Sequence, residues 1–255
     1  MRFLVRPRWL VLLAITLVVS ATCIRLAIWQ WHRLNERRAY IAAVDAGTSR
    51  PPTPLGELFP TSGAETPEAY RRVVATGEYD VVHEVVLYGR TLNEQPGNHL
   101  LTPLILPDGR AVIVDRGWVP FELNTPPVAA ALPPAGSVAV TGVLEPTDPP
   151  GQAGPAGPIT TTTTVDVPRL ALQLPYRVLP LYLWLQSQSP GQPNGEPAPA
   201  PLPPLDEGPH LGYLIQWLAF AVIFMGGYAL LVWREVHREG ERAPSGQNEP
   251  ARIGA

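Results

Sequence analysis

The sequence contains no lysine, a single cysteine and only two methionines among its 255 residues. With Cys23 alone, the chain can form neither an internal disulfide nor a metal site with two thiolates. The net charge of −3 gives no overall basic field, so we expect no nucleic-acid partner. All 19 basic side chains other than histidine are arginines, and with 32 prolines this composition is typical of a GC-rich bacterial genome.

Motifs of the common enzyme classes are also absent. The sequence has no Gly-x-Ser-x-Gly elbow, no glycine-rich phosphate loop and no His-Glu-x-x-His helix. Carboxylates do not pair convincingly for acid–base chemistry. We interpret His83 and His99 as exposed polar residues, because their spacing supports no metal site. The sequence therefore predicts a protein that is not an enzyme.

Two long apolar runs lie near the ends of the chain. Residues 9–29 and 211–233 are each long enough, at ~1.5 Å per residue, to cross a hydrocarbon core of about 30 Å. Both runs end in tryptophan, a common interfacial anchor. A cleaved signal peptide and lipid attachment at Cys23 are alternatives for the first run, but its length favours a retained anchor. We therefore predict two transmembrane helices in contact with membrane lipids.

Arginines predict the orientation of these helices. Three arginines precede the first run, and Arg234 and Arg238 follow the second. Since basic residues favour the cytoplasmic side, both termini are expected there. We predict a bacterial cell-membrane protein with two spans, a cytoplasmic N-terminus over 1–8 and a cytoplasmic tail over 234–255. The intervening part is then extracytoplasmic.

Residues 30–186 are predicted to form a β-rich extracytoplasmic domain. The first helix is expected to continue over 34–46, followed by an irregular lead-in over 50–68. Pro107-Asp108-Gly109 is a turn signal that predicts a hairpin. Runs of β-branched or aromatic residues predict six strands, Tyr70–Tyr79, Glu84–Arg90, Leu100–Leu106, Arg110–Asp115, Ser137–Leu144 and Val178–Leu185.

The C-terminal part of this domain contains weaker signals. Thr160–Thr164 is compatible with a strand or an extended loop, and residues 146–158 form a Pro/Gly loop. A short helix is expected over Val167–Leu174, with Asp166 as its N-cap. The Pro-rich segment 187–209 is typical of an extended tether. The predicted fold class is an α+β membrane protein with one transmembrane helix near each terminus flanking a β-rich extracytoplasmic domain.

Aromatic and basic residues gather at the outer ends of both predicted helices. Spacings of three, four and seven residues place such side chains on one helix face. If the two faces meet, they form an apolar cleft that suits haem, because imidazole ligates haem iron and arginine pairs with propionates. The alternative is an ordinary aromatic belt with arginines at the headgroups. The members are His210, Tyr213 and Trp217 on the second helix, and Arg25, Trp29 and His32 on the first.

Four stretches of the chain resemble motifs of the Surfeit locus protein 1 family. Their order and the two-anchor layout match that family over nearly the whole chain, excluding the tail after about residue 240. Ala27 and Arg37 are departures, standing where the family commonly has glycine and lysine. The matching stretches are Leu26–Arg33, Tyr70–Val73 with Gly77, Pro103–Leu104 through Asp115–Pro120, and Gly208–Tyr213 followed by Gln216-Trp217.

The resemblance implies a membrane-anchored assembly factor for haem-copper cytochrome c oxidase that aids haem a supply or insertion into the catalytic subunit. The implied partners are oxidase subunit I and the haem a synthesis machinery. A membrane-anchored copper chaperone, or a scaffold that binds no haem, is the alternative. Soft Cu(I) usually needs a cysteine pair or a Met/His cluster, which argues against the chaperone.

The resemblance also implies a cofactor site for haem a, with His210 as its metal ligand. In this hypothesis three aromatic side chains line the ring and Arg25 and Arg33 pair with the propionates. The aromatic residues are Tyr213, Trp217 and Trp29. Arg116-Gly117-Trp118 is interpreted as structural, with Gly117 allowing a turn or close approach, although a surface facing membrane or client is the alternative.

Overall fold

The computed structural model describes residues 6–61, 68–150 and 157–241. The chain forms two compact units. The first contains the residues up to Ala39 and those from Asp206 onward, and the second is Tyr40–Leu205. The predicted segments 1–8, 50–68, 146–158 and 234–255 lie partly outside the described residues.

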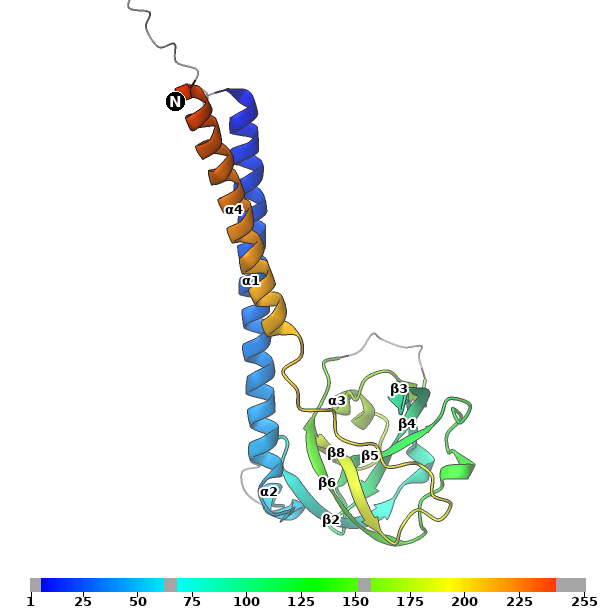
Figure 1. The fold of residues 1–255 in the computed structure, drawn as a ribbon. Coiled ribbons are helices and arrows are strands. Elements are labelled where there is room, and N and C mark those ends of the chain that lie inside the picture. Colours follow the sequence, from blue (N-terminus) through cyan, green and yellow to red (C-terminus); the bar gives the residue numbers. More distant parts are fainter. Residues whose placement is uncertain (1–5, 62–67, 151–156, 242–255) are drawn as a thin grey trace, which may run out of the picture. The chain divides into compact units, whose positions relative to one another are not determined.

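The first unit pairs two helices in antiparallel orientation, α1 (Pro7–Thr48) and α4 (His210–Glu241) (Figure 1). Both are long and apolar enough to cross a membrane, by length and composition. Near one end the rings of Trp9 and Tyr228 lie edge to face, with centroids 6.3 Å apart. Near the other end Gln30 contacts His210. The helical continuation expected over 34–46 is confirmed, because α1 extends to Thr48.

The two helices pack along a regular seam. The spacing of buried positions on α1 alternates between four and three residues, as in left-handed helix pairs. The less exposed positions of α4 repeat in the same way from His210 to Ala221. Small side chains along the seam allow the backbones to approach closely. The buried α1 positions are Thr16, Ser20, Cys23, Ala27, Gln30 and Leu34.

The second unit is a mixed β-sheet that closes on itself. Within the described residues the strand order is β1-β2-β6-β8-β5-β4-β3-β7, and an additional pairing joins β2 to β4. Strands β2, β6, β8, β5 and β4 therefore form a barrel. The bounds are β1 Thr53–Pro54, β2 Arg72–Tyr79, β3 Val85–Leu92, β4 Gln95–Ile105, β5 Ala111–Pro120, β6 Ser137–Pro146, β7 Thr161–Thr162 and β8 Val178–Ser189.

Short helices complete this unit. They are α2 (Leu55–Leu58), η2 (Val81–His83), η3 (Ala129–Ala131) and α3 (Val167–Ala171). The predicted helix after Asp166 is confirmed, and the Asp166 side chain accepts a hydrogen bond from the backbone N–H of Arg169 at 3.1 Å. This contact satisfies one of the free donors at the helix start.

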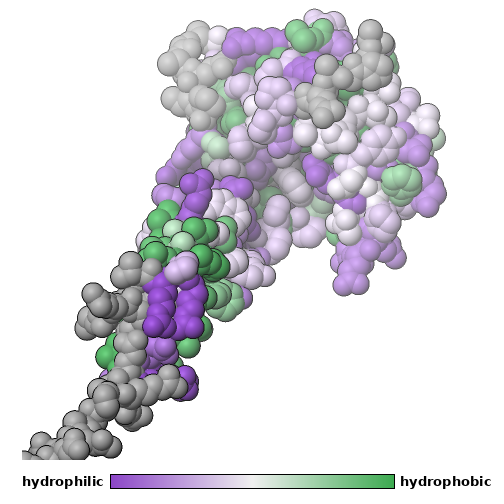
Figure 2. Space-filling model, turned by 90° about the horizontal axis from the view of Figure 1, so that it is seen from above, coloured by the Kyte–Doolittle hydropathy of each residue, from purple (hydrophilic) through white to green (hydrophobic). Residues whose placement is uncertain are grey.

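The barrel interior follows from the period of two in its strands. Alternate residues of β2 and β5, such as Val73 and Val112, are fully buried in one hydrophobic core with leucines of β8. Phe59, which follows α2, joins the same core with no exposed surface. Figure 2 shows both green and deep purple side chains on the visible part of the helical unit, whereas the visible surface of the barrel unit is mostly white and purple.

Two sequence expectations for the barrel unit differ in outcome. The hairpin around Pro107-Asp108-Gly109 is confirmed, because β4 and β5 are antiparallel neighbours. The segment 187–209, expected as a tether, instead contributes to the barrel unit as far as Leu205. β8 continues to Ser189, and Ala198 exchanges two backbone hydrogen bonds with Trp118, at 2.8 and 2.9 Å. Ala198 can do so because, unlike the prolines around it, it has a backbone N–H.

Candidate functional site

His210 is the first residue of α4 and is half-buried. Its Nδ1 lies 2.8 Å from Oε1 of Gln30, whose side chain is buried in the helix seam. Among the described residues, Nε2 of His210 makes no hydrogen bond, and it is not one of the buried unpartnered atoms. A neutral imidazole with this arrangement has one ring nitrogen held and the other open to a ligand.

The turn before α4 is fixed by contacts with α1. Arg38 donates to both carboxylate oxygens of Glu207, at 2.8 and 2.9 Å. The neighbouring Arg37 donates through Nε to the carbonyl oxygen of Asp206 at 2.8 Å. The Asp206 side chain in turn accepts from the backbone N–H of Gly208 at 2.8 Å. These contacts position the first turn of α4, and with it His210.

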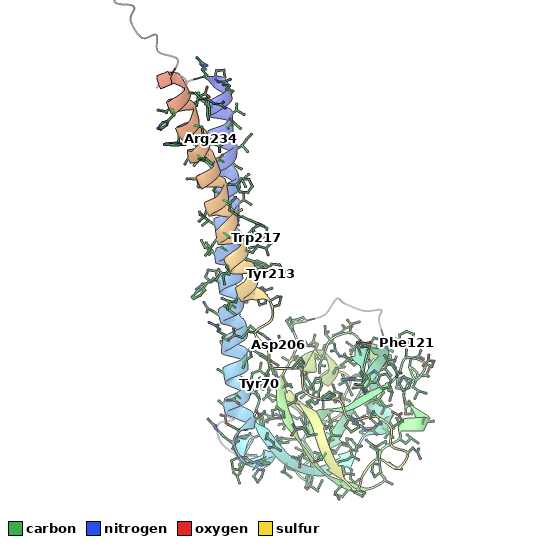
Figure 3. The ribbon with its side chains drawn as sticks, viewed as in Figure 1. Tyr70, Phe121, Asp206, Tyr213, Trp217 and Arg234 are labelled. Carbon is green, nitrogen blue, oxygen red and sulfur yellow. The ribbon has the colours of Figure 1, made fainter. Side chains whose placement is uncertain are left out.

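Tyr213 and Trp217 follow His210 along α4, and Figure 3 shows them one above the other on that helix. Trp217 is half-buried in the seam, and its ring lies edge to face with Phe220 at a centroid distance of 5.8 Å. Tyr213 is 47% exposed. The structure therefore brings an imidazole and two aromatic rings together on one stretch of α4.

The predicted residues of α1 lie on a different side of that helix. Arg25, Trp29 and His32 line an open groove formed by α1 alone, and Trp29 is 51% exposed. Arg33 lies over the Trp29 ring at 6.0 Å. Each residue turns an α-helix by about 100°, so Trp29 cannot share the seam with Gln30. The structure does not bring Arg25, Trp29 and Arg33 to His210.

The sequence did not predict that Gln30 contacts His210. The expected cleft relied on the spacing of aromatic and basic residues, which describes a face of α1 that points away from α4. The signal that identifies the correct face is the four-three spacing of small and polar residues along α1. Gln30 belongs to that series, together with Ala27 and Leu34.

The barrel unit contains a second polar centre, around Arg116 and Glu84. The two side chains are almost completely buried and form an ion pair at 3.1 Å. Glu84 also accepts hydrogen bonds from Thr102 and from the backbone N–H of Val128, at 3.1 and 2.8 Å. Arg116 further donates to the Ala131 carbonyl at 2.6 Å. Burial raises the pKa of Glu84, and these donors oppose that effect.

A neighbouring contact corrects the interpretation of His99. It was expected to be exposed, but it is only 4% exposed and its Nδ1 lies 2.8 Å from Asp115. Its ring lies edge to face with Trp184, with centroids 5.5 Å apart. The expectation was wrong because the partner carboxylate comes from the adjacent strand β5, which spacing along the chain does not reveal.

Gly117 lies at a bulge in β5. His99 pairs with Trp118 and Leu101 with Asp115, so β5 has one more residue than β4 over this stretch. Gly117 has a φ of +121°, and a Cβ there would overlap the carbonyl oxygen of Ala198. The other carboxylate oxygen of Asp115 accepts from the Gly117 N–H at 3.1 Å. These contacts confirm a structural role for Gly117.

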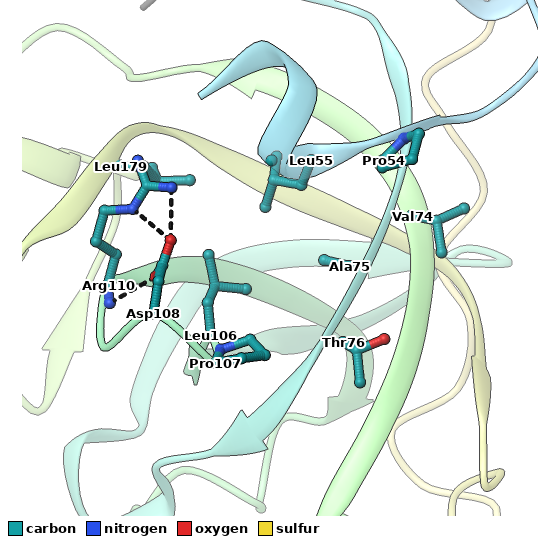
Figure 4. Close-up of a pocket in the computed structure, with 11 residues that line it drawn as sticks. Pro54, Leu55, Val74, Ala75, Thr76, Leu106, Pro107, Asp108, Arg110 and Leu179 are labelled. Carbon is teal, nitrogen blue, oxygen red and sulfur yellow. Dashed lines mark hydrogen bonds and ion pairs between the residues drawn. The ribbon is translucent and has the colours of Figure 1, made fainter. Parts of the chain in front are cut away.

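At the other end of the barrel is an apolar pocket of about 360 Å³ beside α2 (Figure 4). Arg110 lines it, and its guanidinium donates to Asp108 and to the Phe59 carbonyl. The guanidinium holds the pKa of Asp108 below its usual range. Arg110 and Asp108 belong to the turn between β4 and β5, and Phe59 directly follows α2. These hydrogen bonds therefore join the turn to the segment after α2. Within the described ranges, no three His, Cys, Asp or Glu side chains gather as potential metal ligands.

Comparison with known proteins finds similarity to one protein family over most of the chain. A model described as the SURF1 family matches residues 17–222. SURF1-like proteins of Mycobacterium tuberculosis and Mycobacterium bovis are 28% identical over 95% of this chain and 90% of their own length. The cytochrome oxidase assembly protein SHY1 of Saccharomyces cerevisiae is 34% identical over 40% of this chain and 26% of its own length. The family match includes both Gln30 and His210.

Proposed function

Because the chain belongs to the SURF1 family, we propose that it is a membrane-anchored assembly factor for haem-copper cytochrome c oxidase, with no catalytic turnover of its own. The support for this role is the family match over residues 17–222 and the similarity to a yeast protein named for cytochrome oxidase assembly. The proposed partners are oxidase subunit I and the haem a synthesis machinery.

The proposed location is a bacterial cell membrane, with both termini cytoplasmic and the barrel unit on the other side. The support is the pair of antiparallel apolar helices, together with Arg234 and Arg238, which follow the apolar run 211–233 within α4. Reporter fusions at residue 150 and at the C-terminus test this arrangement. A cytoplasmic signal at residue 150 would contradict it.

The proposed cargo is haem a, ligated by His210 at the mouth of the helix pair. The observation that supports the fit is a ring with Nδ1 held by Gln30 and Nε2 without a hydrogen bond among the described residues. Tyr213 and Trp217 offer one aromatic wall beside it. In this proposal the His210 imidazole would hold haem a, with Tyr213 and Trp217 as apolar neighbours on the same helix.

The proposed site is restricted to these residues of α4. Arg25, Trp29 and Arg33 are not included, because they lie on α1 outside the seam that contains Gln30.

The test is complementation of a strain that lacks this gene and any second family member. Wild-type protein should restore the haem a absorption of the oxidase, while His210→Ala should not, at equal protein level in the membrane. His237→Ala is the matched control, because His237 is an exposed histidine near the opposite end of α4, where it contacts the Trp233 carbonyl and ring.

The outcomes separate the two parts of the proposal. Unchanged oxidase in the deletion strain would overturn the assembly role. Full restoration by His210→Ala would remove His210 as the ligand and leave a scaffold that binds no haem. The visible spectrum of the purified wild-type protein, from a host that makes haem a, decides directly whether the cargo binds.

A further inference from the structure

Gln30 is a polar side chain inside an otherwise small and apolar part of the helix seam. Its residue is 7% exposed, and its seam neighbours Ala27 and Leu34 are 2% and 0% exposed. An amide that is buried without a hydrogen-bond partner destabilises the folded state. The hydrogen bond that compensates for this cost is the one to His210, at 2.8 Å across the two helices.

We propose that Gln30 is a positioning residue that holds His210 in the Nδ1–H tautomer, so that Nε2 carries the lone pair for the iron. This inference rests on the proposed haem a binding and deepens it. The residue itself does not contact the iron. It acts through the imidazole, as carbonyl and carboxylate partners do for many metal-bound histidines.

The chemistry follows from the atoms that meet. Oε1 of a glutamine is an acceptor, so Nδ1 of His210 must donate at 2.8 Å. A neutral imidazole has one N–H only, and Nε2 is therefore left unprotonated. Because α1 supplies Gln30 and α4 supplies His210, the correct tautomer depends on the pairing of the two helices.

The residues just before His210 leave its Nε2 edge accessible. A Cβ at Gly208 would lie 3.6 Å from Cδ2 and 3.7 Å from Nε2 of His210, so a longer side chain there would cover this edge. Gly208 also has a φ of +66°, which favours glycine. Pro209 has no backbone N–H that could donate to the lone pair.

The test uses three variants in the full-length protein. Gln30→Leu removes the acceptor at similar volume, and Gln30→Glu keeps an acceptor oxygen. Gln216→Leu is the matched control, because Gln216 is an exposed glutamine on α4 with no hydrogen bond among the described residues. Gly208→Asn is a fourth variant, since asparagine tolerates the left-handed conformation and adds a side chain beside Nε2.

The first measurement is made without haem. The ¹⁵N shifts of histidine ring nitrogens report which nitrogen is protonated, and His210→Ala assigns the signals among the five histidines. Wild type, Gln30→Glu and Gln216→Leu should show the Nδ1–H form of His210. Gln30→Leu should shift it toward Nε2–H. An Nε2–H form in the wild type, or no change in Gln30→Leu, would overturn the inference.

The second measurement is haem a retained by the purified variants. Gln30→Leu should weaken retention by about 10–100-fold, the usual effect of removing such a partner, and Gln30→Glu should restore it. Gly208→Asn should reduce retention while leaving the tautomer unchanged. Equal retention in wild type and Gln30→Leu would overturn the positioning role.

The two proposals fail in different ways. If the wild-type protein retains no haem a, the proposed cargo is wrong, and the ring-nitrogen shifts still decide whether Gln30 sets the tautomer. If haem a binds through His210 but the tautomer ignores Gln30, only the inference falls.

Discussion

Two polar centres of this protein, Glu84 with Arg116 and Gln30 with His210, differ in how completely their groups are paired. In the barrel unit, Glu84 and Arg116 neutralise each other and bind neighbouring groups, and the one unpartnered nitrogen, Nε of Arg116, is sealed from solvent. In the helical unit, one nitrogen of the half-buried His210 ring is held by Gln30, while the other has no hydrogen-bond partner among the residues that the structure describes. Breaking a buried ion pair destabilises a fold because it leaves an uncompensated charge, whereas a ring nitrogen that is accessible and has a free lone pair can bind a ligand.

Glu84→Ala tests the barrel side of this comparison and should have the largest effect. Removing one partner of a buried ion pair leaves an uncompensated charge and typically costs about 3–5 kcal/mol. We expect a large drop in the unfolding midpoint of the detergent-solubilised protein, followed by thermal denaturation. His210→Ala should lower this midpoint clearly less, because only the neutral Gln30 amide loses its partner. A similar loss in both variants would contradict the distinction between a structural and a binding centre.

Gly117→Ala should have an intermediate effect. A side chain at a φ of +121° is strained by about 1–3 kcal/mol, and its Cβ would overlap the Ala198 carbonyl. We expect the pairing between Trp118 and Ala198 to open, which limited proteolysis of the segment 190–205 would detect as faster cleavage. Gly191→Ala is the control, because a Cβ there meets nothing within 4 Å. Equal cleavage in both variants would show that the bulge does not hold this segment.

Glu145 should show the smallest effect. It is a buried carboxylate that, within the described part of the chain, has no ion pair of the kind that Glu84 forms. Burial, with a smaller contribution from Asp148, raises the pKa of Glu145 to about 7. The folded state therefore binds a proton that the unfolded state releases above its ordinary pKa of 4.5. This contribution to stability is fully present below about pH 4.5 and is lost as the pH rises through 7.

The corresponding measurement is the unfolding midpoint at about pH 5 and pH 8. Wild type should lose stability between these values, and Glu145→Gln should lose less, since its amide does not titrate. A steeper pH dependence in Glu145→Gln would contradict the raised pKa. Glu84→Gln is a useful comparison, because that side chain faces a guanidinium instead of another carboxylate.

Local patterns in the sequence predicted the elements of the barrel better than their assembly. The turn at Pro107-Asp108-Gly109 and the cap at Asp166 act over a few residues, and both are confirmed. Closure through β2 and β4 is non-local, and so is the pairing of Ala198 with Trp118. Such pairings depend on how whole strands pack, which the alternation of apolar residues does not encode.

In the candidate site, too, the sequence predicted the grouping of residues along one helix but not the contact between the two helices. His210 and its aromatic neighbours share one helix, so their spacing along α4 was sufficient to group them. The partner of His210 on α1, Gln30, could be predicted only if the face of α1 that packs against α4 were known. Arg25 and Trp29 have the chemistry of a haem site, but Gln30 has the correct angular position.

The alternating seam of α1 and α4 has a consequence for insertions and deletions in the helices. The contact between Gln30 and His210 depends on the helical phase, which the whole run from Thr16 to Leu34 transmits. One residue added within that run would rotate the helix beyond it by about 100° and advance it by ~1.5 Å. The apolar content would be unchanged, yet Gln30 would leave the imidazole and a neighbouring side chain would take its angular position. The contact between Gln30 and His210 therefore depends on the number of residues in this run of α1 as well as on the identity of the two side chains.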